Sequence, residues 1–261
     1  MFPAACAQCF TPPVARYLGE KKLSAPIIVG GVGGSGTRLV VQMLLDIGVF
    51  MGSLRNGSED AMPFVSLYDN HINAYLSGSV NCSGLVDELL QALGLHWGRG
   101  GNNAIGPWGW KNPRSIYLLP VLDGLFEGMR FIHVVRDGIT MATSKNQAQL
   151  QKHGGSVIPE EFQKLAQTER ALLLWSFINN DAADYGKQMG NRYLLLRYED
   201  ICDDPAIATV ALASALGIDQ SNQAGVLVHA SRVRDMKLMS KIEGKAADIT
   251  SAALRRFGYP C

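Results

Sequence analysis

The residues with the clearest chemical signal form a glycine-rich segment near the N-terminus. Residues 30–38 read GGVGGSGTR, after a β-branched run at 27–29 and before apolar residues at helical spacing over 39–47. Between a strand and a helix, glycines let the backbone curl until successive N–H groups point at one spot, where the helix N-terminus adds partial positive charge. Glycines also serve tight turns for steric reasons alone. The strand-to-helix context favours a loop that binds a tetrahedral oxyanion.

The same loop lacks two features of a nucleoside triphosphatase. Residues 31–36 have the glycine spacing of a P-loop, but Thr37 and Arg38 follow where a lysine and then a serine or threonine are required. The strand predicted at 131–135 is followed by Arg136 instead of a magnesium-binding aspartate. These departures argue against ATP or GTP hydrolysis. A phosphotransferase with a degenerate P-loop stays as an alternative.

A second candidate anion site begins at Arg136. This residue directly follows the predicted strand 131–135, at the carboxyl edge where open parallel sheets bind ligands. Ser144 comes eight residues later, two turns into the helix expected at about 138–151. A guanidinium can hold a phosphate with two parallel hydrogen bonds, and a hydroxyl can add a third. The alternative is a surface pair of Arg136 with Asp137, with Ser144 solvated.

The elements that must position these residues alternate between strands and helices. Strands are predicted at 27–29, 108–110, 131–135 and 193–196, and helices at 39–47, 138–151 and 159–189 among others. This alternation indicates an α/β fold: a parallel sheet of about four to five strands flanked by helices in three layers, similar to P-loop proteins. Residues 1–25 are expected to be an irregular lead-in and 26–261 a single domain, in which 52–106 is a Gly-, Asn- and Ser-rich insertion on the substrate side.

Composition narrows the class of function. The 261 residues include 24 basic and 23 acidic side chains, a net charge of +1, so a bulk electrostatic grip on nucleic acid is not expected and any anion site must be local. No segment has the features of a signal peptide or the roughly 18 apolar residues of a membrane span. The sequence therefore predicts a cytoplasmic protein without a membrane partner.

The five cysteines do not have the pattern of a disulfide framework. They are scattered and odd in number: Cys6, Cys9, Cys82, Cys202 and Cys261. Cys6 and Cys9 form a C-x-x-C pair in the lead-in, with no second pair or histidine cluster beside it. Free thiols are therefore expected, with a zinc site as a remote alternative. No metal is assigned.

Three motifs together resemble those of the PAPS-dependent sulfotransferases, where PAPS is 3′-phosphoadenosine 5′-phosphosulfate. Residues 33–39 look like their 5′-phosphosulfate loop. Arg136 with Ser144 is similar to their 3′-phosphate motif, in which an arginine precedes a serine by eight positions. The segment 197–205, which reads RYEDICDDP, resembles one that follows a later strand in the family. The resemblance covers about residues 26–205 in the family's order.

The resemblance implies a set of nucleotide-binding residues. The 5′-phosphosulfate would be held by the loop residues Gly33, Gly34, Ser35, Gly36, Thr37 and Arg38, through their backbone amides and the hydroxyls of the serine and threonine. Arg136 and Ser144 would hold the 3′-phosphate, and Tyr198 would lie near the adenine. Arg255 and Arg256 are candidates for the basic loop near the C-terminus of family members, although an exposed basic helix end is an equal alternative.

The chain departs from the family at two catalytic positions. Many members have a lysine or arginine where this chain has Gly34, and that cation stabilises the leaving oxygen; here Arg38 or Lys111 would have to replace it. Lys111 resembles a family lysine that follows this strand, but Pro113 stands where soluble members place a histidine base.

The general base must therefore come from elsewhere. Some branches of the family use a carboxylate about twenty residues past the loop, where this chain has Glu59 and Asp60. Burial can raise the pKa of such a group towards neutrality. Asp60 ranks first, Glu59 second and His71 third, and adjacent acids in such a loop can also be merely solvated.

The expected activity is transfer of a sulfuryl group from PAPS to a hydroxyl or amine, releasing adenosine 3′,5′-bisphosphate (PAP) without a metal. The acceptor would be a small molecule, carbohydrate or peptide, and the sequence does not identify it or the oligomeric state. Trp97, Trp108 and Trp110 could stack on an acceptor ring or simply be core residues. A non-catalytic nucleotide-binding module is the further alternative.

Overall fold

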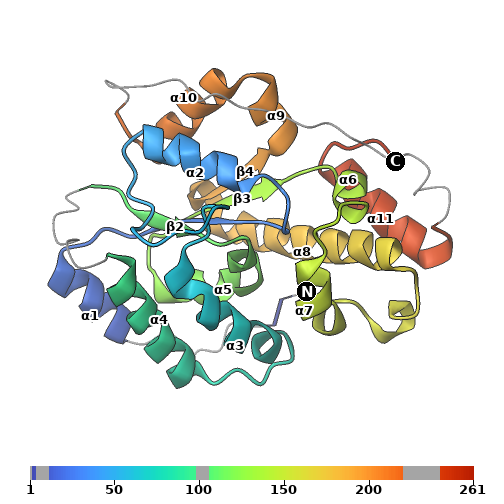
Figure 1. Cartoon of the computed structure of the whole chain (residues 1–261), viewed down its shortest axis with the longest axis horizontal. Helices are drawn as coiled ribbons and strands as arrows, with labels where there is room; N and C mark the ends of the chain where they lie inside the picture. The colour runs from blue at the N-terminus through green and yellow to red at the C-terminus, as the bar shows by residue number, and fades with distance from the viewer. Residues whose placement is uncertain (1, 4–11, 98–105, 220–241) are drawn as a thin grey trace.

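A computed structural model describes residues 2–3, 12–97, 106–219 and 242–261. It has four parallel strands: β1 (Ile27–Gly30), β2 (Gly109–Lys111), β3 (Arg130–Val135) and β4 (Tyr193–Arg197). The helices before β2 are α1 (Pro12–Lys21), α2 (Thr37–Asp46), η2 (Met62–Phe64), α3 (Val65–Leu76) and α4 (Cys82–His96). Between β2 and β4 lie η3 (Pro113–Leu118), α5 (Leu119–Leu125), α6 (Gly138–Ala142), α7 (Ala148–Val157), η4 (Glu160–Phe162), α8 (Gln167–Met189) and η5 (Gly190–Arg192). α9 (Tyr198–Asp203), α10 (Pro205–Leu216) and α11 (Gly244–Arg256) follow (Figure 1).

The order of the strands places the glycine-rich loop in the middle of the sheet. The order is β2-β1-β3-β4, so β1 has a partner on each side. In its register, Ile28 pairs with both Trp110 and Phe131, and His133 of β3 pairs with Leu195 of β4. Because all strands are parallel, their carboxyl ends meet at one edge, where the loop after β1 lies between the ends of β2 and β3. The predicted α/β architecture with a parallel sheet is confirmed.

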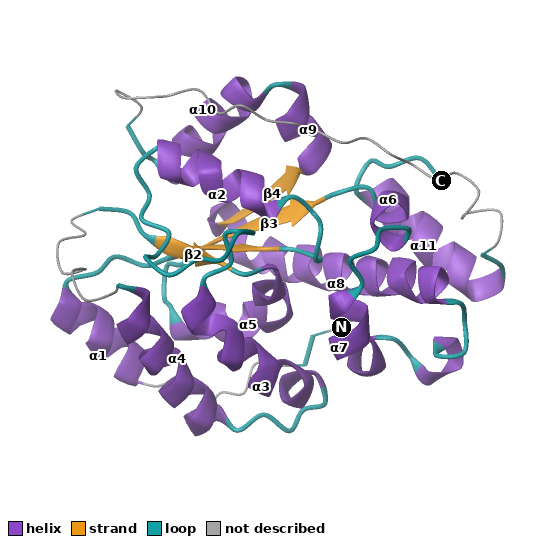
Figure 2. Ribbon diagram, viewed as in Figure 1, coloured by secondary structure: helices purple, strands orange, loops and turns teal. Residues whose placement is uncertain are grey.

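Alternation along the strands divides the core into two layers. Ile27, Val29 and Ile132 point to the face covered by α2, α9 and α10, whereas Ile28 and Phe131 point to the opposite face. That second face is covered by α3, α4, α5, α8 and α11, so helices enclose the sheet on both sides (Figure 2). Double coverage explains why the strands are apolar at successive positions.

Helical segments differ from the sequence-based expectations in three places. Residues 12–21 of the lead-in, expected to be irregular, form α1, whose Val14 is fully buried against the core. The insertion 52–106 contains two helices, α3 and α4. The helix expected at 159–189 is a short η4 followed by α8. In the first two cases contacts with the rest of the molecule stabilise a segment whose local periodicity is weak.

The helix expected at 138–151 is also divided, into α6 and α7. α6 ends at Ala142, and polar side chains then satisfy its last carbonyl groups: the Thr143 hydroxyl donates to the Ile139 oxygen at 2.9 Å, and the Gln147 amide donates to the Met141 oxygen at 3.1 Å. Side chains of this kind compete with the helical hydrogen bonds of the backbone. Ser144 therefore lies in the turn between two helices and not on a helix.

The cysteines need one correction. Cys82, at the first residue of α4, is disulfide-bonded, whereas Cys202 and Cys261 are free. Cys6 and Cys9 lie outside the described residues. Among the described helices, none is both long enough and apolar enough to cross a membrane.

Three histidines are buried without charge and should make stability depend on pH. Burial lowers the pKa of His96, His133 and His153 to about 4, although His96 Nε2 donates to the Gly109 oxygen and His133 Nε2 donates to Asn179. In the unfolded chain their pKa is about 6.5. Since protons then bind the unfolded state more tightly, the free energy of unfolding falls as pH drops from 7.5 to 5.5, by about 1.3 kcal/mol for each histidine.

Urea unfolding at the two pH values measures this effect. The total loss expected from the three histidines is about 4 kcal/mol, and His96→Phe should reduce it by about a third. Carboxylates contribute little in this range because they remain ionised in both states. A free energy of unfolding that stays constant between pH 7.5 and 5.5 would show that these side chains are not buried as the structure has them.

Candidate functional site

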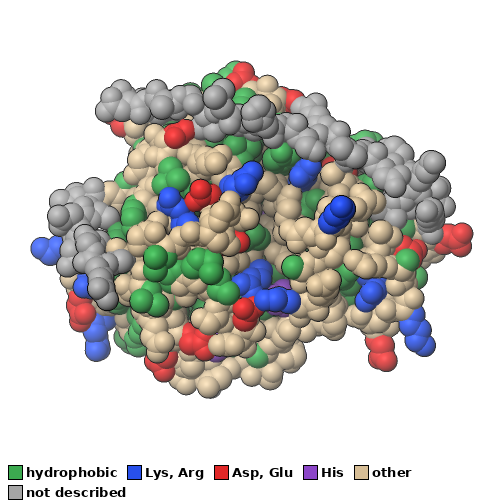
Figure 3. Space-filling view, viewed as in Figure 1, with side chains coloured by type: hydrophobic (Ala, Val, Ile, Leu, Met, Phe, Trp, Pro, Cys, Tyr) green, Lys and Arg blue, Asp and Glu red, His purple; other side chains and the backbone are tan. Residues whose placement is uncertain are grey.

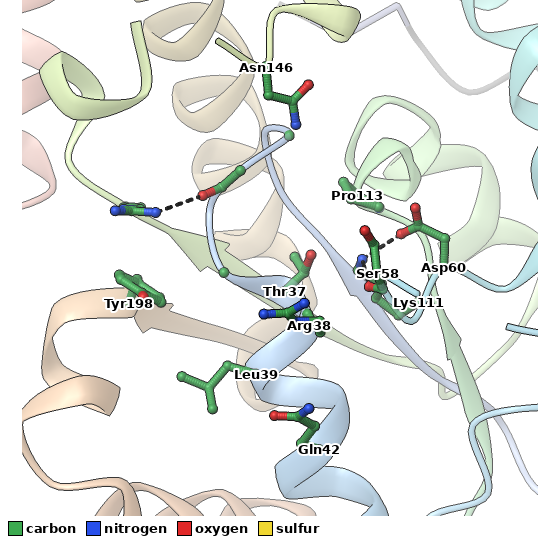
Figure 4. A pocket seen from close by; sticks show the side chains of 14 residues that line it. Thr37, Arg38, Leu39, Gln42, Ser58, Asp60, Lys111, Pro113, Asn146 and Tyr198 are labelled. Carbon is green, nitrogen blue, oxygen red and sulfur yellow. Dashed lines mark hydrogen bonds and ion pairs between the residues drawn. The ribbon is translucent and has the colours of Figure 1, made fainter. Parts of the chain in front are cut away.

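A cleft of about 460 Å³ opens at the carboxyl edge of the sheet. The glycine-rich loop forms its floor, and side chains from the ends of β2, β3 and β4 surround it (Figure 4). The lining residues are Gly33, Gly34, Gly36, Thr37, Arg38, Leu39, Gln42, Ser58, Asp60, Lys111, Pro113, Arg136, Asn146 and Tyr198. Residues more than 160 positions apart in the sequence thus share one cleft.

The loop presents unpaired backbone donors to this cleft. Gly34 and Gly36 have φ values of 98° and 94°, in the left-handed region that favours glycine. Among the hydrogen bonds of the described residues, the N–H groups of 33, 34 and 36–38 have no acceptor, since the internal bonds of the loop are made by Ser35 N to the Val32 oxygen and by Leu39 N to Gly36. Unpaired N–H groups at the N-terminus of α2 are suited to bind an oxyanion.

Contacts from other elements hold the loop open. Gly31 N donates to the Pro113 oxygen at 3.0 Å, which ties the loop to the end of β2. On the other side the Tyr198 ring packs directly on Gly36, where an added Cβ would lie 2.2 Å from the ring. Ser35 is buried, its hydroxyl has no partner in the described structure, and it does not line the cleft, whereas Thr37 does. The Ser35 hydroxyl would therefore need a side-chain rotation to reach a ligand.

Two glycines with similar backbones provide a test of this packing. Gly48 also has a positive φ, 83°, but an added Cβ there meets nothing within 4 Å. We expect Gly48→Ala to lower the free energy of unfolding by about 1 kcal/mol, from backbone strain alone. Gly36→Ala should lower it by about 3 kcal/mol, because the Cβ also collides with Tyr198. Equal losses in urea unfolding would show that the ring does not rest on the loop.

Arg136 lies at the loop's other flank. Its guanidinium carbon is 4.5 Å from the centre of the Tyr198 ring, and its Nη1 donates to the Gly34 oxygen at 3.4 Å. Its own carbonyl oxygen accepts a hydrogen bond from Trp175 Nε1 at 3.0 Å, which fixes the backbone after β3. The stacked guanidinium therefore lines the cleft and does not turn away from it.

The segment that begins with Arg197 supports this flank. Glu199 accepts hydrogen bonds from the backbone of Asp137 at 3.0 Å and from the Tyr259 hydroxyl at 2.7 Å. Arg197 stacks on the same tyrosine, 4.7 Å from its ring centre. The motif thus links the turn after β3 to the C-terminal residues, and of its side chains Tyr198 lines the cleft.

Besides Ser35, three predicted nucleotide-binding residues lie outside the cleft lining. Ser144 is exposed in the turn after α6, where its carbonyl oxygen accepts from Gln147, and Asn146 lines the cleft instead. Arg256 forms an ion pair with Asp184 of α8 at 2.8 Å. Arg255 contacts Cys261 at 3.6 Å. The basic end of α11 is thus engaged with the protein's own side chains.

An ion pair occupies the flank of the cleft at the end of β2. Lys111 is almost fully buried, and its Nζ donates to Asp60 Oδ1 at 2.5 Å and to the Ser58 oxygen at 2.9 Å. Burial lowers the pKa of the Lys111 ammonium group, and the Asp60 carboxylate opposes that shift. In Figure 4, Asp60, Ser58 and Lys111 lie together on one side of Arg38, and Tyr198 lies on its other side.

The structure separates the three candidates for a general base. Asp60 lines the cleft beside Lys111. Glu59 adopts a positive φ of 62° and pairs with Arg55 at 2.8 Å, and it is not part of the lining. His71 is buried between α3 and α4, 3.4 Å from Glu88 and away from the cleft.

Sequence reasoning missed five lining residues, among them Pro113, which it considered only as the residue in place of a histidine base. Gln42 and Leu39 belong to α2, and the helical spacing of Gln42 from Arg38 was the one available signal. Ser58 and Asn146 come from irregular segments, and nothing in their local sequence indicates the cleft.

The tryptophans belong to the core. Trp108 and Trp110 are fully buried, and Trp97 stacks on Phe50 with a centroid distance of 4.8 Å. None of the three lines the cleft. They are therefore not placed to stack on an acceptor.

The charged side chains on the face shown in Figure 3 are spread over it and do not form one cluster. Figure 3 shows basic side chains over its middle, with acidic and hydrophobic ones between them, and no continuous basic patch among the coloured residues. This distribution agrees with the near-zero net charge of +1. Anion binding would thus depend on a few placed groups in the cleft.

The chain is similar to known sulfotransferases in sequence pattern and in fold. A family model described as the sulfotransferase family matches residues 26–222. Similar solved structures include a sulfotransferase domain from the curacin biosynthetic pathway (TM-score 0.55, 16% identity, 91% of this chain and 98% of that chain covered). Another is the sulfotransferase STF1 of Mycobacterium tuberculosis H37Rv (TM-score 0.56, 15% identity, 95% of this chain and 81% of that chain covered). A third is a sulfotransferase domain from the olefin synthase of Synechococcus PCC 7002 (TM-score 0.50, 17% identity, 91% of this chain and 97% of that chain covered). No curated protein sequence matches significantly. At these identities the structures show a shared fold.

Proposed function

This chain belongs to the sulfotransferase family, and from that premise we propose that it transfers a sulfuryl group from PAPS to a hydroxyl or amine, releasing PAP. One observation carries the choice of donor. The open loop of unpaired N–H groups lies between two basic flanks, Arg136 stacked on Tyr198 and Lys111 paired with Asp60. A donor with anionic groups at two ends of a ribose needs such separate sites.

The residues of the cleft fit the proposed donor. The N–H groups of 33, 34 and 36–38, with the Thr37 hydroxyl, would hold the 5′-phosphosulfate. Arg136 would hold the 3′-phosphate, with Tyr198 beside the nucleoside. Asn146 is placed to assist in the role we expected for Ser144. PAPS would supply an electrophilic sulfur.

The protein's own groups have two tasks in sulfuryl transfer. The acceptor oxygen or nitrogen attacks sulfur, the bond from sulfur to the leaving phosphate breaks, and negative charge accumulates on that phosphate. Arg38 and the buried Lys111 would neutralise this charge in place of the cation absent at Gly34. Asp60 would take the acceptor's proton.

Calorimetric titration tests the donor assignment. We expect PAP to bind without metal, and to bind more tightly than AMP, because AMP lacks the 3′-phosphate. Mg-ATP should bind weakly, since the loop lacks the P-loop lysine. Tight binding of Mg-ATP with no response to PAP would reject this function and favour a phosphotransferase.

The acceptor and the location are also part of the proposal. We propose a small-molecule, carbohydrate or peptide acceptor, and no nucleic acid. We also propose a cytoplasmic location. The disulfide of Cys82 argues against that location, because disulfides rarely persist in a reducing compartment. Fractionation of cells expressing the full chain would test it.

A further inference from the structure

The loop that carries Asp60 is organised around a single side chain, that of Asn56. Its Oδ1 accepts hydrogen bonds from the backbone N–H groups of Ser58 and Asp60, each at 2.9 Å. Its Nδ2 donates to Asp60 Oδ2 at 3.2 Å. Its backbone N–H donates to the Asp60 oxygen at 3.1 Å, and its carbonyl accepts from Glu59 N at 2.9 Å. Asparagine is suited to this task because its amide both donates and accepts.

These hydrogen bonds determine which acceptor atoms of the loop face the Lys111 ammonium group. The carboxylate of Asp60 is held at Oδ2 by Asn56, so Oδ1 is turned to Lys111 at 2.5 Å. The bond to Ser58 N fixes the neighbouring peptide, and the Ser58 oxygen is the second acceptor for Lys111, at 2.9 Å. Both acceptors of the buried ammonium therefore depend on the Asn56 amide.

The far end of the loop is anchored independently. Ala61 N donates to the Lys111 oxygen at 2.8 Å, and Met62 N donates to the Leu54 oxygen at 3.0 Å. Even without the Asn56 side chain the loop would thus keep Ala61 on β2 and Met62 on Leu54, while its interior would lose its fixed shape. This separation makes the role of Asn56 testable without unfolding the domain.

We propose that Asn56 is a positioning residue that keeps Lys111 protonated in the cleft. It does so by holding the Asp60 carboxylate and the Ser58 carbonyl against the ammonium group. The catalytic use of that charge rests on the proposed function, whereas the positioning itself does not. Lys111 needs this help because burial disfavours its charged form.

Other charges around Lys111 do not replace Asp60. Arg38, on α2, disfavours the ammonium form, and Glu59 favours it from the same loop. The Glu59 carboxylate is engaged with Arg55 at 2.8 Å. Asp60 is the acid in direct contact, so its orientation should dominate the titration.

The experiment follows the titration of Lys111 by NMR of its side chain in the full-length protein. Asn56→Ala should lower the pKa of Lys111 below its value in the wild type, in the direction of Asp60→Asn, which removes the carboxylate charge altogether. Asn56→Asp keeps the Oδ1 acceptor but loses the donor to Asp60 Oδ2, and its negative charge raises the pKa of Lys111 by itself. The deciding variant is therefore Asn56→Ala, which changes no charge: a residue without a positioning role would leave the titration of Lys111 unchanged.

The matched control is Asn81→Ala. Asn81 caps α4 by accepting from Gly84 N, and no part of it lines the cleft. It should leave the titration of Lys111 unchanged. An unchanged titration in Asn56→Ala would overturn the inference, while a failure of PAP to bind in calorimetry would reject only the proposed function.

Discussion

Replacing Arg136 with alanine should lower the affinity for PAP about 100-fold and leave the affinity for AMP nearly unchanged. A paired, charge-assisted contact to a phosphate contributes about 3 kcal/mol, which corresponds to that factor. AMP has no 3′-phosphate and so loses little. Titration calorimetry with both nucleotides measures the two affinities, and their ratio should fall towards one in the variant.

Two arginine variants sharpen this prediction. Arg136→Lys keeps the charge but not the planar group that stacks on Tyr198, so it should recover only part of the affinity. Arg256→Ala removes an arginine that is paired with Asp184 outside the cleft, so PAP should bind as in the wild type. If Arg256→Ala were the variant that lost affinity for PAP, the 3′-phosphate site would lie at the end of α11.

Asp60→Asn should slow sulfuryl transfer by about 10²- to 10⁴-fold, the usual contribution of a positioned general base. The amide keeps the shape of the carboxylate and can still accept from Lys111, but it cannot take up a proton. PAP affinity should change by less than about threefold, because this side chain faces Lys111 and not the loop amides. The readout is transfer of ³⁵S from labelled PAPS to a panel of phenols, alcohols and amines.

Glu59→Gln is the matched comparison. It makes the same chemical change one residue earlier, at a carboxylate that pairs with Arg55 and does not line the cleft. Transfer should stay within about threefold of the wild type. A larger loss in Glu59→Gln than in Asp60→Asn would move the base to Glu59. A wild type that binds PAP but labels none of these acceptors would favour a non-catalytic binding module.

The fold and the two flanking cations, Arg136 and Lys111, were predictable because they depend on short-range patterns. β-branched runs such as 27–29 and 131–135 indicate buried parallel strands wherever they occur, and residues after such strands reach one edge of the sheet. The glycine-rich loop and Arg136 are in this position. Both therefore line the cleft, where sequence reasoning placed them.

Residues on irregular segments could not be placed in this way. Glu59 and Asp60 are adjacent acids in one loop, and only the hydrogen bonds of Asn56 and the anchor at β2 decide that Asp60 faces the cleft. The helix break after Ala142 likewise places Asn146 in the lining and leaves Ser144 exposed.

The amino-acid sequence by itself determined the parallel α/β sheet, the glycine-rich turn after β1 and the arginine after β3, because each is encoded within a few neighbouring positions. Only the tertiary structure decided which carboxylate meets Lys111 and that Arg256 is engaged by Asp184. Those outcomes depend on pairings across 51 and 72 residues. Such pairings are determined by the packing of elements against each other. The spacing of neighbouring residues in the sequence gives no information about them.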